Sequence, residues 1–98
     1  MTIEKIAKKK ELTIKIGGRL DTATSPKLEA ELKQSLNGIT KLVLDFATLE
    51  YLSSAGLRII LQAQKMMNRQ GEMIIKNANE TISEIFEITG FVDFLTIE

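Results

Sequence analysis

The sequence lacks several residue types on which common protein chemistry depends. It contains no cysteine and no histidine, which excludes disulfides, thiolate metal sites, cysteine nucleophiles, Ser-His-Asp catalysis and most zinc sites. Tryptophan is also absent, and aromatic residues make up only 5% of the chain. A chain so poor in catalytic side chains is predicted to bind a partner rather than to act as an enzyme, and no metal or cofactor is expected.

The chain also has no excess of charge and no long apolar run. Lys plus Arg and Asp plus Glu both number 13, so no overall field attracts nucleic acid or an anionic membrane. The Lys8-Lys9-Lys10 run stands beside Glu11 and is interpreted as a solvated turn. Met1–Lys5 lacks the apolar core of an export signal, and no segment has membrane-spanning length. We expect a cytoplasmic protein without direct nucleic-acid binding or membrane insertion.

The 98 residues suffice for one domain, 1–98, which opens with a predicted β-hairpin. Thr2–Ala7 is a weak strand pattern typical of a sheet edge. In residues 12–16 every second residue is apolar, as in a half-buried strand. Gly17-Gly18 then indicates a bend or bulge.

A first helix is predicted after the loop that begins at Asp21. Ser25 is a suitable N-cap and Pro26 a suitable first helical residue. Leucines recur every fourth residue from Leu28 to Leu36, and Lys27 and Glu31 are expected to pair four residues apart. Asn37-Gly38 ends this helix.

The rest of the chain continues to alternate strands and helices. The predicted elements are a buried strand over Lys41–Phe46, a helix from Ser53 or Ser54 to about Gln70, a strand over Glu72–Lys76, a helix capped by Asn77 or Asn79 and stopped at Gly90, and a last strand over Phe94–Ile97. The order implies a single α/β domain with a mixed sheet of four to five strands, built from an N-terminal hairpin and βαβαβ-type crossovers, with three or more helices.

Two adjacent serines stand where the second predicted helix begins. The start of a helix presents unpaired N–H groups and the positive end of its dipole, so a serine there can cap the helix, help bind a phosphate, or carry one. Helical spacing places Ser54 on the polar stripe with Arg58, and Ser53 nearer the buried side. Ser53 is therefore the better cap and Ser54 the more accessible hydroxyl. From these residues alone, a role of both serines in capping remains the commoner alternative.

Other residues near this turn are candidate contacts. Gly56 permits close approach of a backbone or ligand, and Arg58 lies one turn from Ser54, where it is able to pair with a phosphate. Asp21 and Thr24 follow a strand, so their loop is expected to flank the serine turn at the same sheet edge, with Tyr51 at the rim.

The segment Asp45–Arg58, Asp-Phe-Ala-Thr-Leu-Glu-Tyr-Leu-Ser-Ser-Ala-Gly-Leu-Arg, resembles the signature of the STAS domain of bacterial anti-sigma factor antagonists. Gly18-Arg-Leu-Asp21 resembles the family's Gly-x-Leu-Asp loop, and Gly71-Glu-Met resembles its entry to the next strand. Phe86 and Thr89-Gly90-Phe91 resemble the late helix and its stop. The resemblance covers nearly the whole chain.

The resemblance implies a phosphorylation switch. In that family the unphosphorylated protein binds an anti-sigma factor, which is also a GHKL-type serine kinase, and frees the sigma factor. The kinase phosphorylates a serine two residues before the Gly-Leu pair, which is Ser54 here, and a PP2C-type phosphatase reverses the modification. The implied partner surface contains Ser53, Gly56, Arg58, Asp21, Thr24 and Tyr51.

The sequence leaves two other functions open. One is a STAS scaffold or regulatory subunit of a signalling or transport assembly that is never phosphorylated. The other is a hydrolase or nucleotide-binding enzyme that uses Ser54, which the lack of histidine, of a nearby lysine base and of a Gly-rich phosphate loop disfavours.

Overall fold

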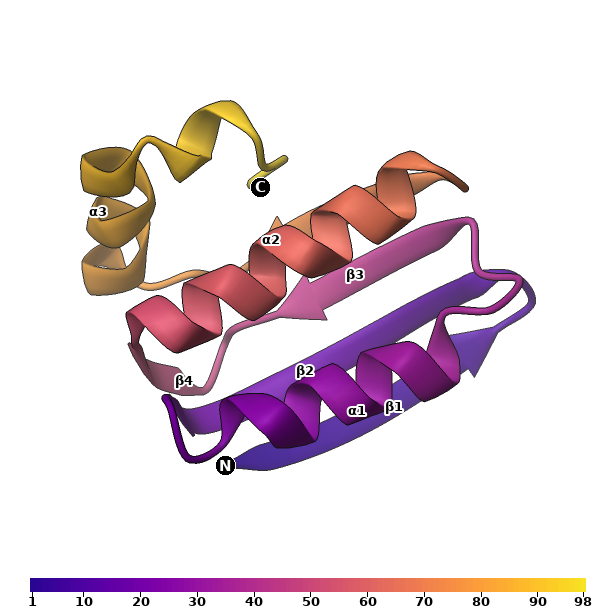
Figure 1. Cartoon of the computed structure of the whole chain (residues 1–98), viewed down its shortest axis with the longest axis horizontal. Helices are drawn as coiled ribbons and strands as arrows, with labels where there is room; N and C mark the ends of the chain where they lie inside the picture. The colour runs from indigo at the N-terminus through magenta and orange to yellow at the C-terminus, as the bar shows by residue number, and fades with distance from the viewer.

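Strands and helices alternate along most of the polypeptide (Figure 1). The computed structural model describes all residues, 1–98. The elements are β1 (Thr2–Lys8), β2 (Glu11–Leu20), α1 (Ser25–Ser35), β3 (Lys41–Asp45), β4 (Leu49–Leu52), α2 (Ser54–Asn68), β5 (Glu72–Lys76), α3 (Glu80–Thr89) and a 3-10 turn over Phe91–Asp93. The expected α/β class is confirmed, and its mixed sheet has five strands.

The sheet follows the order β1-β2-β3-β5, and β4 extends it by pairing with the end of β2. β1 is antiparallel to β2, whereas every other pairing is parallel. The first hairpin closes because Lys9 adopts a left-handed conformation, φ 58°, in the turn between Lys8 and Glu11. The later strands are parallel because a helix carries the chain back to the starting end of the sheet before each of β3 and β5.

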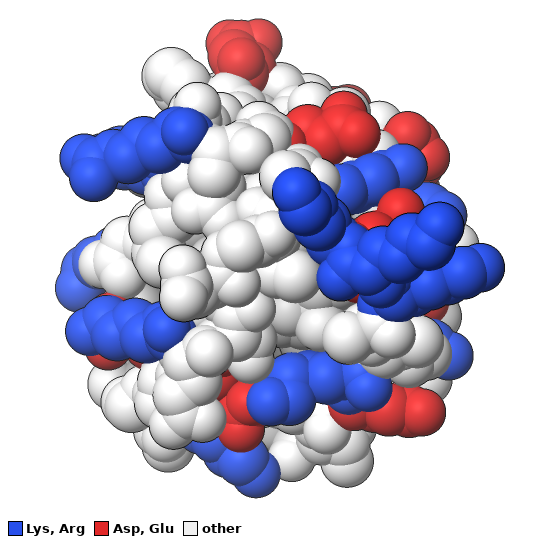
Figure 2. Space-filling model, turned by 90° about the vertical axis from the view of Figure 1, so that its right-hand side faces the viewer, with Lys and Arg blue, Asp and Glu red and all other residues white.

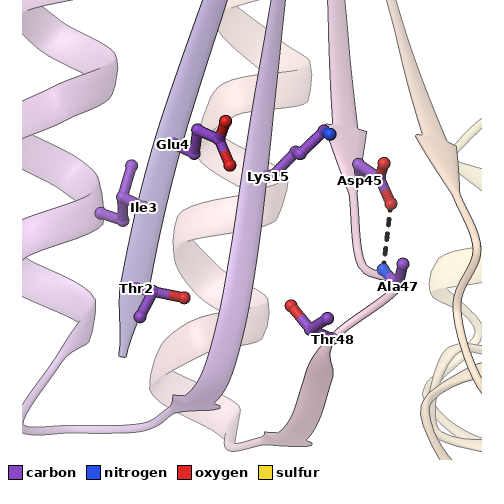
Figure 3. A pocket seen from close by; sticks show the side chains of 7 residues that line it. All are labelled: Thr2, Ile3, Glu4, Lys15, Asp45, Ala47 and Thr48. Carbon is purple, nitrogen blue, oxygen red and sulfur yellow. Dashed lines mark hydrogen bonds between the residues drawn. The ribbon is translucent and has the colours of Figure 1, made fainter.

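α1 and α2 lie side by side against one face of the sheet, and α3 lies beyond the carboxyl ends of β3 and β5 (Figure 1). The apolar sides of the helices and the facing side chains of β2, β3 and β5 form one core cluster of 23 buried residues. Leu28, Leu32 and Leu36 supply the α1 side, as their spacing predicts. The opposite face of the sheet is polar apart from Ile6, Val43 and Ile74, and it is not covered by α1 or α2 (Figure 3).

Most predicted helix ends are confirmed. Asn79 caps α3 through a hydrogen bond from Ile82 N to its Oδ1 at 2.9 Å, and Gly90 stops α3 with a φ of 78°. The prediction that Ser25 caps α1 is wrong, because Ser25 is the first helical residue and its hydroxyl donates to the Asp21 carbonyl instead. The expected pairing of Glu31 with Lys27 is also wrong, since the Glu31 carboxylate binds Lys5 of β1 at 2.7 Å.

β4 is a strand that the sequence pattern does not reveal. Its residues alternate irregularly between buried and exposed, because the register with β2 shifts between Gly18 and Arg19. Gly18 pairs with Leu49 and Arg19 with Tyr51, so Glu50 is an extra residue at this bulge. The predicted irregularity at Gly17-Gly18 agrees with this register shift after Gly18, but the extra residue lies in β4, where it breaks the period of two.

The predicted last strand, Phe94–Ile97, is wrong except for one bridge. Both Phe94 N and Leu95 N donate to Phe91 O, which keeps the backbone in a turn as far as Leu95. Only Ile97 then reaches the sheet, as a parallel bridge to Ile75 of β5.

Candidate functional site

The two adjacent serines at the start of α2 have different environments. Ser53 is the N-cap residue, in an extended conformation, and its Oγ accepts a hydrogen bond from Gly56 N at 3.2 Å. Its own N–H donates to Leu20 O at 2.9 Å, which ties the turn to the end of β2. Ser54, the first helical residue, is exposed, whereas Ser53 is partly buried. The structure therefore separates a structural hydroxyl from an accessible one.

Gly56 lies where α2 comes closest to the strands behind it. A Cβ added here would stand 2.9 Å from Leu20 O and 2.8 Å from the Leu52 side chain. Real Cβ atoms do not approach other atoms this closely, and the backbone oxygen has little freedom to move. Glycine thus sets the distance of the serine turn from the sheet, so the predicted close approach is to the chain's own backbone.

α2 presents the predicted polar stripe to solvent. The exposed residues are Arg58, Gln62, Lys65 and Arg69, and the buried ones on the other side are Gly56, Ile60, Ala63 and Met67. Arg58 stands four residues after Ser54, one helical turn along the same side. A cation therefore lies near the accessible hydroxyl.

The loop between β2 and α1 flanks the serine turn, as expected, because β2 and β4 end side by side. Leu20 pairs with Leu52, and the loop and the turn continue from these two residues. Thr24 Oγ1 donates to Arg19 O at 2.8 Å and accepts from Asp21 N at 2.9 Å. These bonds hold Asp21 and Thr24 in fixed positions within the loop.

The pKa of the Asp21 carboxyl lies below its ordinary value. The hydrogen bond from the backbone N–H of Thr24 lowers its pKa most, and burial opposes this effect. The Thr24 hydroxyl, the Ala23 N–H and Arg19 add to the lowering. The Arg19 Nε lies 3.5 Å from Asp21 Oδ2. The loop thus carries a carboxylate beside a guanidinium group.

Arg19 is a rim residue that sequence reasoning missed. Its guanidinium carbon lies 4.1 Å from the centre of the Tyr51 ring, which is a cation–π contact between β2 and β4. The Tyr51 side chain is exposed despite this contact. The only signal in the sequence is the place of Arg19 in Gly18-Arg-Leu-Asp21; its pairing with Tyr51 depends on β4, which the pattern does not reveal.

Two surface hollows lie away from this turn. One, of about 330 Å³, lies on the uncovered sheet face between β1, β2 and the chain after β3, where Asp45 accepts from Ala47 N at 3.0 Å (Figure 3). The other, of about 540 Å³, lies at the Lys8–Lys10 turn and has no apolar lining. Figure 2 looks at that end and shows acidic side chains among the basic ones. Neither has the apolar lining of a typical small-molecule site.

No group of three or more Asp or Glu residues is arranged to hold a metal ion. None of the helices is both long enough and apolar enough to span a bilayer.

Comparison with known proteins agrees with this geometry. The family model described as STAS domain matches residues 2–98. The putative anti-sigma factor antagonist BtrV of Bordetella bronchiseptica is 37% identical over 82 residues, which are 82% of this chain and 71% of that protein. These two matches are enough to establish the family.

Solved structures agree on the fold. The anti-sigma factor antagonist SpoIIAA in its unphosphorylated form superposes with a TM-score of 0.85 at 17% identity, over 99% of this chain and 88% of that one. The Bacillus cell fate determinant SpoIIAA in the phosphorylated form gives 0.78 at 17% identity, over 99% and 91%. The chain therefore belongs to the STAS domain family, among the anti-sigma factor antagonists.

Proposed function

We propose that this protein binds an anti-sigma factor in its unphosphorylated form and is switched off by phosphorylation of Ser54. The observation that carries the proposal is the difference in environment between the two adjacent serines. Ser53 Oγ is occupied by the cap bond to Gly56 N, whereas Ser54 is exposed on the first turn of α2. A kinase can reach the Ser54 hydroxyl without opening the helix.

The position of Ser54 suits a switch that leaves the domain folded. A phosphate adds about −1.5 to −2 charges, which the N-terminus of a helix tolerates through its free N–H groups and dipole. Arg58 is exposed one turn away and can pair with the added phosphate. The new charge therefore acts on the partner's surface rather than on the stability of α2.

The surface around Ser54 is proposed to be the partner-binding site. Tyr51 offers an exposed aromatic ring, Arg58 a cation, and the loop with Asp21 and Thr24 a fixed carboxylate and hydroxyl. Gly56 and Ser53 position this surface through their contacts with Leu20. Aromatic and arginine side chains are the residue types that most often dominate binding energy at protein interfaces.

The proposed partners are a GHKL-type anti-sigma factor serine kinase and a PP2C-type phosphatase. Binding to the kinase releases a sigma factor, and dephosphorylation restores binding, so the protein acts as a cytoplasmic regulator and not as an enzyme. Support comes from BtrV, named a putative anti-sigma factor antagonist, and from SpoIIAA, which is known in unphosphorylated and phosphorylated forms.

Intact-mass spectrometry and peptide mapping test the site. The purified protein is incubated with ATP and a GHKL-type anti-sigma factor kinase from the same genome. One phosphate is expected, on Ser54, and Ser54→Ala should abolish it. Ser53→Ala is the matched control, because it removes the neighbouring hydroxyl but keeps Ser54, and it should still accept one phosphate.

Two outcomes would contradict the assignment. If Ser54→Ala is phosphorylated to the same extent as wild type, the acceptor is another residue. If the protein forms a stable partner complex whose stability is unchanged by kinase, by ATP and by Ser54→Ala, it is a constitutive STAS scaffold or regulatory subunit instead.

A further inference from the structure

The outer side of β1 is an uncovered edge of the sheet. β1 pairs only with β2, through a hairpin whose two-residue turn lies between Lys8 and Glu11. Residues that flank such a turn bond each other, so the backbone groups of every second residue of β1 point outward. Those residues are Ile3, Lys5 and Ala7, and no other strand pairs with β1.

The opposite edge of the sheet, the outer side of β5, is partly covered. Ile75 of β5 donates its N–H to Thr96 O at 2.9 Å and accepts from Glu98 N at 2.8 Å. The tail of the chain thus covers the middle of that edge. An edge with unpaired backbone groups is a template for another strand, and β1 offers seven regular residues of this kind.

The uncovered face of the sheet carries three rows of side chains that run across the strands. The outer rows are Glu4, Lys15, Asp45, Lys76 and Lys8, Glu11, Lys41, Glu72, and the middle row is Ile6, Thr13, Val43, Ile74. Charge alternates in sign along each outer row. The two outer rows also carry opposite signs on every strand.

The middle row is buried within the sheet but open at its edge. Val43 and Ile74 are only 4% and 7% exposed, whereas Ile6 on β1 is 47% exposed. The β1 edge therefore presents an apolar side chain between a carboxylate, Glu4, and an ammonium group, Lys8. Such a strand is complementary to a second copy of itself that runs antiparallel to it.

We propose that β1 is a homodimerisation edge, at which a second copy of this chain pairs its β1 antiparallel. The register sets Ile6 opposite Ile6 of the second copy and Glu4 opposite Lys8 of the second copy, twice by symmetry. Lys5 and Ala7 then lie opposite each other and exchange the outward backbone hydrogen bonds. The alternation of charge and the apolar middle row both continue across the seam.

Neighbouring registers lack this complementarity. A shift of two residues in one direction sets Ile6 opposite Glu4 of the second copy, and a shift of two residues in the other direction sets Ile6 opposite Lys8. Both registers place a charge against an apolar side chain. A further shift in the first direction sets Glu4 opposite Glu4, and like charges directly opposite are destabilising. A shift by an odd number of residues would exchange the two faces of the sheet, so only even shifts keep them continuous. Among these, the proposed register is the one with complementary side chains.

Lysines on an edge strand usually discourage pairing, but both lysines of β1 have partners in this arrangement. Lys8 meets Glu4 of the second copy. Lys5, on the helix side, already binds the Glu31 carboxylate of α1 at 2.7 Å. Lys5 and Ala7 remain exposed on that side, so α1 does not cover the edge strand.

Charge reversal tests the proposal by sedimentation velocity over a concentration series of the full chain. Wild type is expected to shift from monomer to dimer as concentration rises. Glu4→Lys and Lys8→Glu should each weaken self-association about tenfold, because two attractive pairs become two repulsive ones. An equimolar mixture of the two variants should associate as wild type does, since each repulsive pair is then replaced by an attractive one.

A second variant separates dimerisation from folding. Ala7→Pro removes an N–H that points away from β2, so the hairpin should persist while the dimer is lost; circular dichroism verifies the fold. The proposal is overturned if wild type stays monomeric throughout, if either single reversal dimerises like wild type, or if the mixture of reversals stays monomeric.

Discussion

Gly56 is the residue at which the serine turn meets the strands behind it, and it gives a test at the residue scale. Gly56→Ala gains about 1 kcal/mol of helix propensity but forces a methyl group against Leu20 O, which costs about 1–3 kcal/mol. The nearest contact distances, 2.8 and 2.9 Å, make overpacking the larger effect. We expect a net loss of about 1 kcal/mol in the free energy of unfolding, measured by urea denaturation.

The control for that substitution is Gln62→Ala, an exchange at an exposed position of the same helix. It should change stability by less than about 0.5 kcal/mol. An unchanged or raised stability of Gly56→Ala would show that α2 can move away from β2, and that glycine does not fix the position of the serine turn.

Single residues also show which parts of the site could be predicted from the sequence. The polar stripe of α2 was enough to place Ser54 outside and Ser53 inside, because helical geometry relates residues four apart. The contact between Arg19 and Tyr51 was not predictable, because it joins residues on two strands whose pairing is displaced by a bulge. Local periodicity carries no information about such a register shift.

At the scale of elements, a polar contact joins the ends of β3 and β5 next to the chain that leads to the serine turn. Asn77 Nδ2 donates to Asp45 Oδ1 at 2.9 Å, and Asn77 adopts a left-handed conformation, φ 62°. This hydrogen bond lowers the pKa of Asp45 below its ordinary value of 3.8. Burial opposes this effect, and the Ala47 N–H and the charges of Lys15 and Lys76 add to the lowering.

A lowered pKa means that folding favours the ionised carboxylate of Asp45. The stabilisation is therefore complete above the pKa of the unfolded chain and is lost as pH falls through the lower pKa of the folded chain. Asp45→Asn lacks this titration, so its deficit in unfolding free energy should shrink as pH falls from about 5 to about 2. Urea denaturation at a series of pH values measures the deficit, and a deficit that stays constant would contradict the assignment.

The strand that was missed and the strand that was wrongly predicted both depend on distant partners. The strands β1, β2, β3 and β5 and all the helices follow from local apolar periodicity and from caps such as Asn79 and Gly90. β4 depends on the bulged end of β2, and the expected last strand fails because hydrogen bonds to Phe91 O hold its start in a turn. The apolar periodicity of these segments predicts neither the bulged pairing nor the hydrogen bonds to Phe91 O.

At the scale of the whole molecule, the layered fold gives the proposed switch and the proposed dimer edge separate places. The serine turn lies at the end of β2 and β4 beneath α2, whereas the free edge of β1 lies at the side of the sheet. α2 contacts β5 and α1, and no contact of comparable extent joins it to β1. Phosphorylation of Ser54 and self-association through β1 are therefore expected to be independent.

The claim that Ser54 is the switch is tested most directly by one affinity measurement. The protein is prepared with phosphoserine at position 54, and its affinity for the purified anti-sigma factor kinase is compared with that of the unmodified protein by isothermal titration calorimetry. Because about −1.5 to −2 charges enter the binding surface, we predict a loss of affinity of at least about tenfold with unchanged circular dichroism. Equal affinity of the two forms would contradict the account.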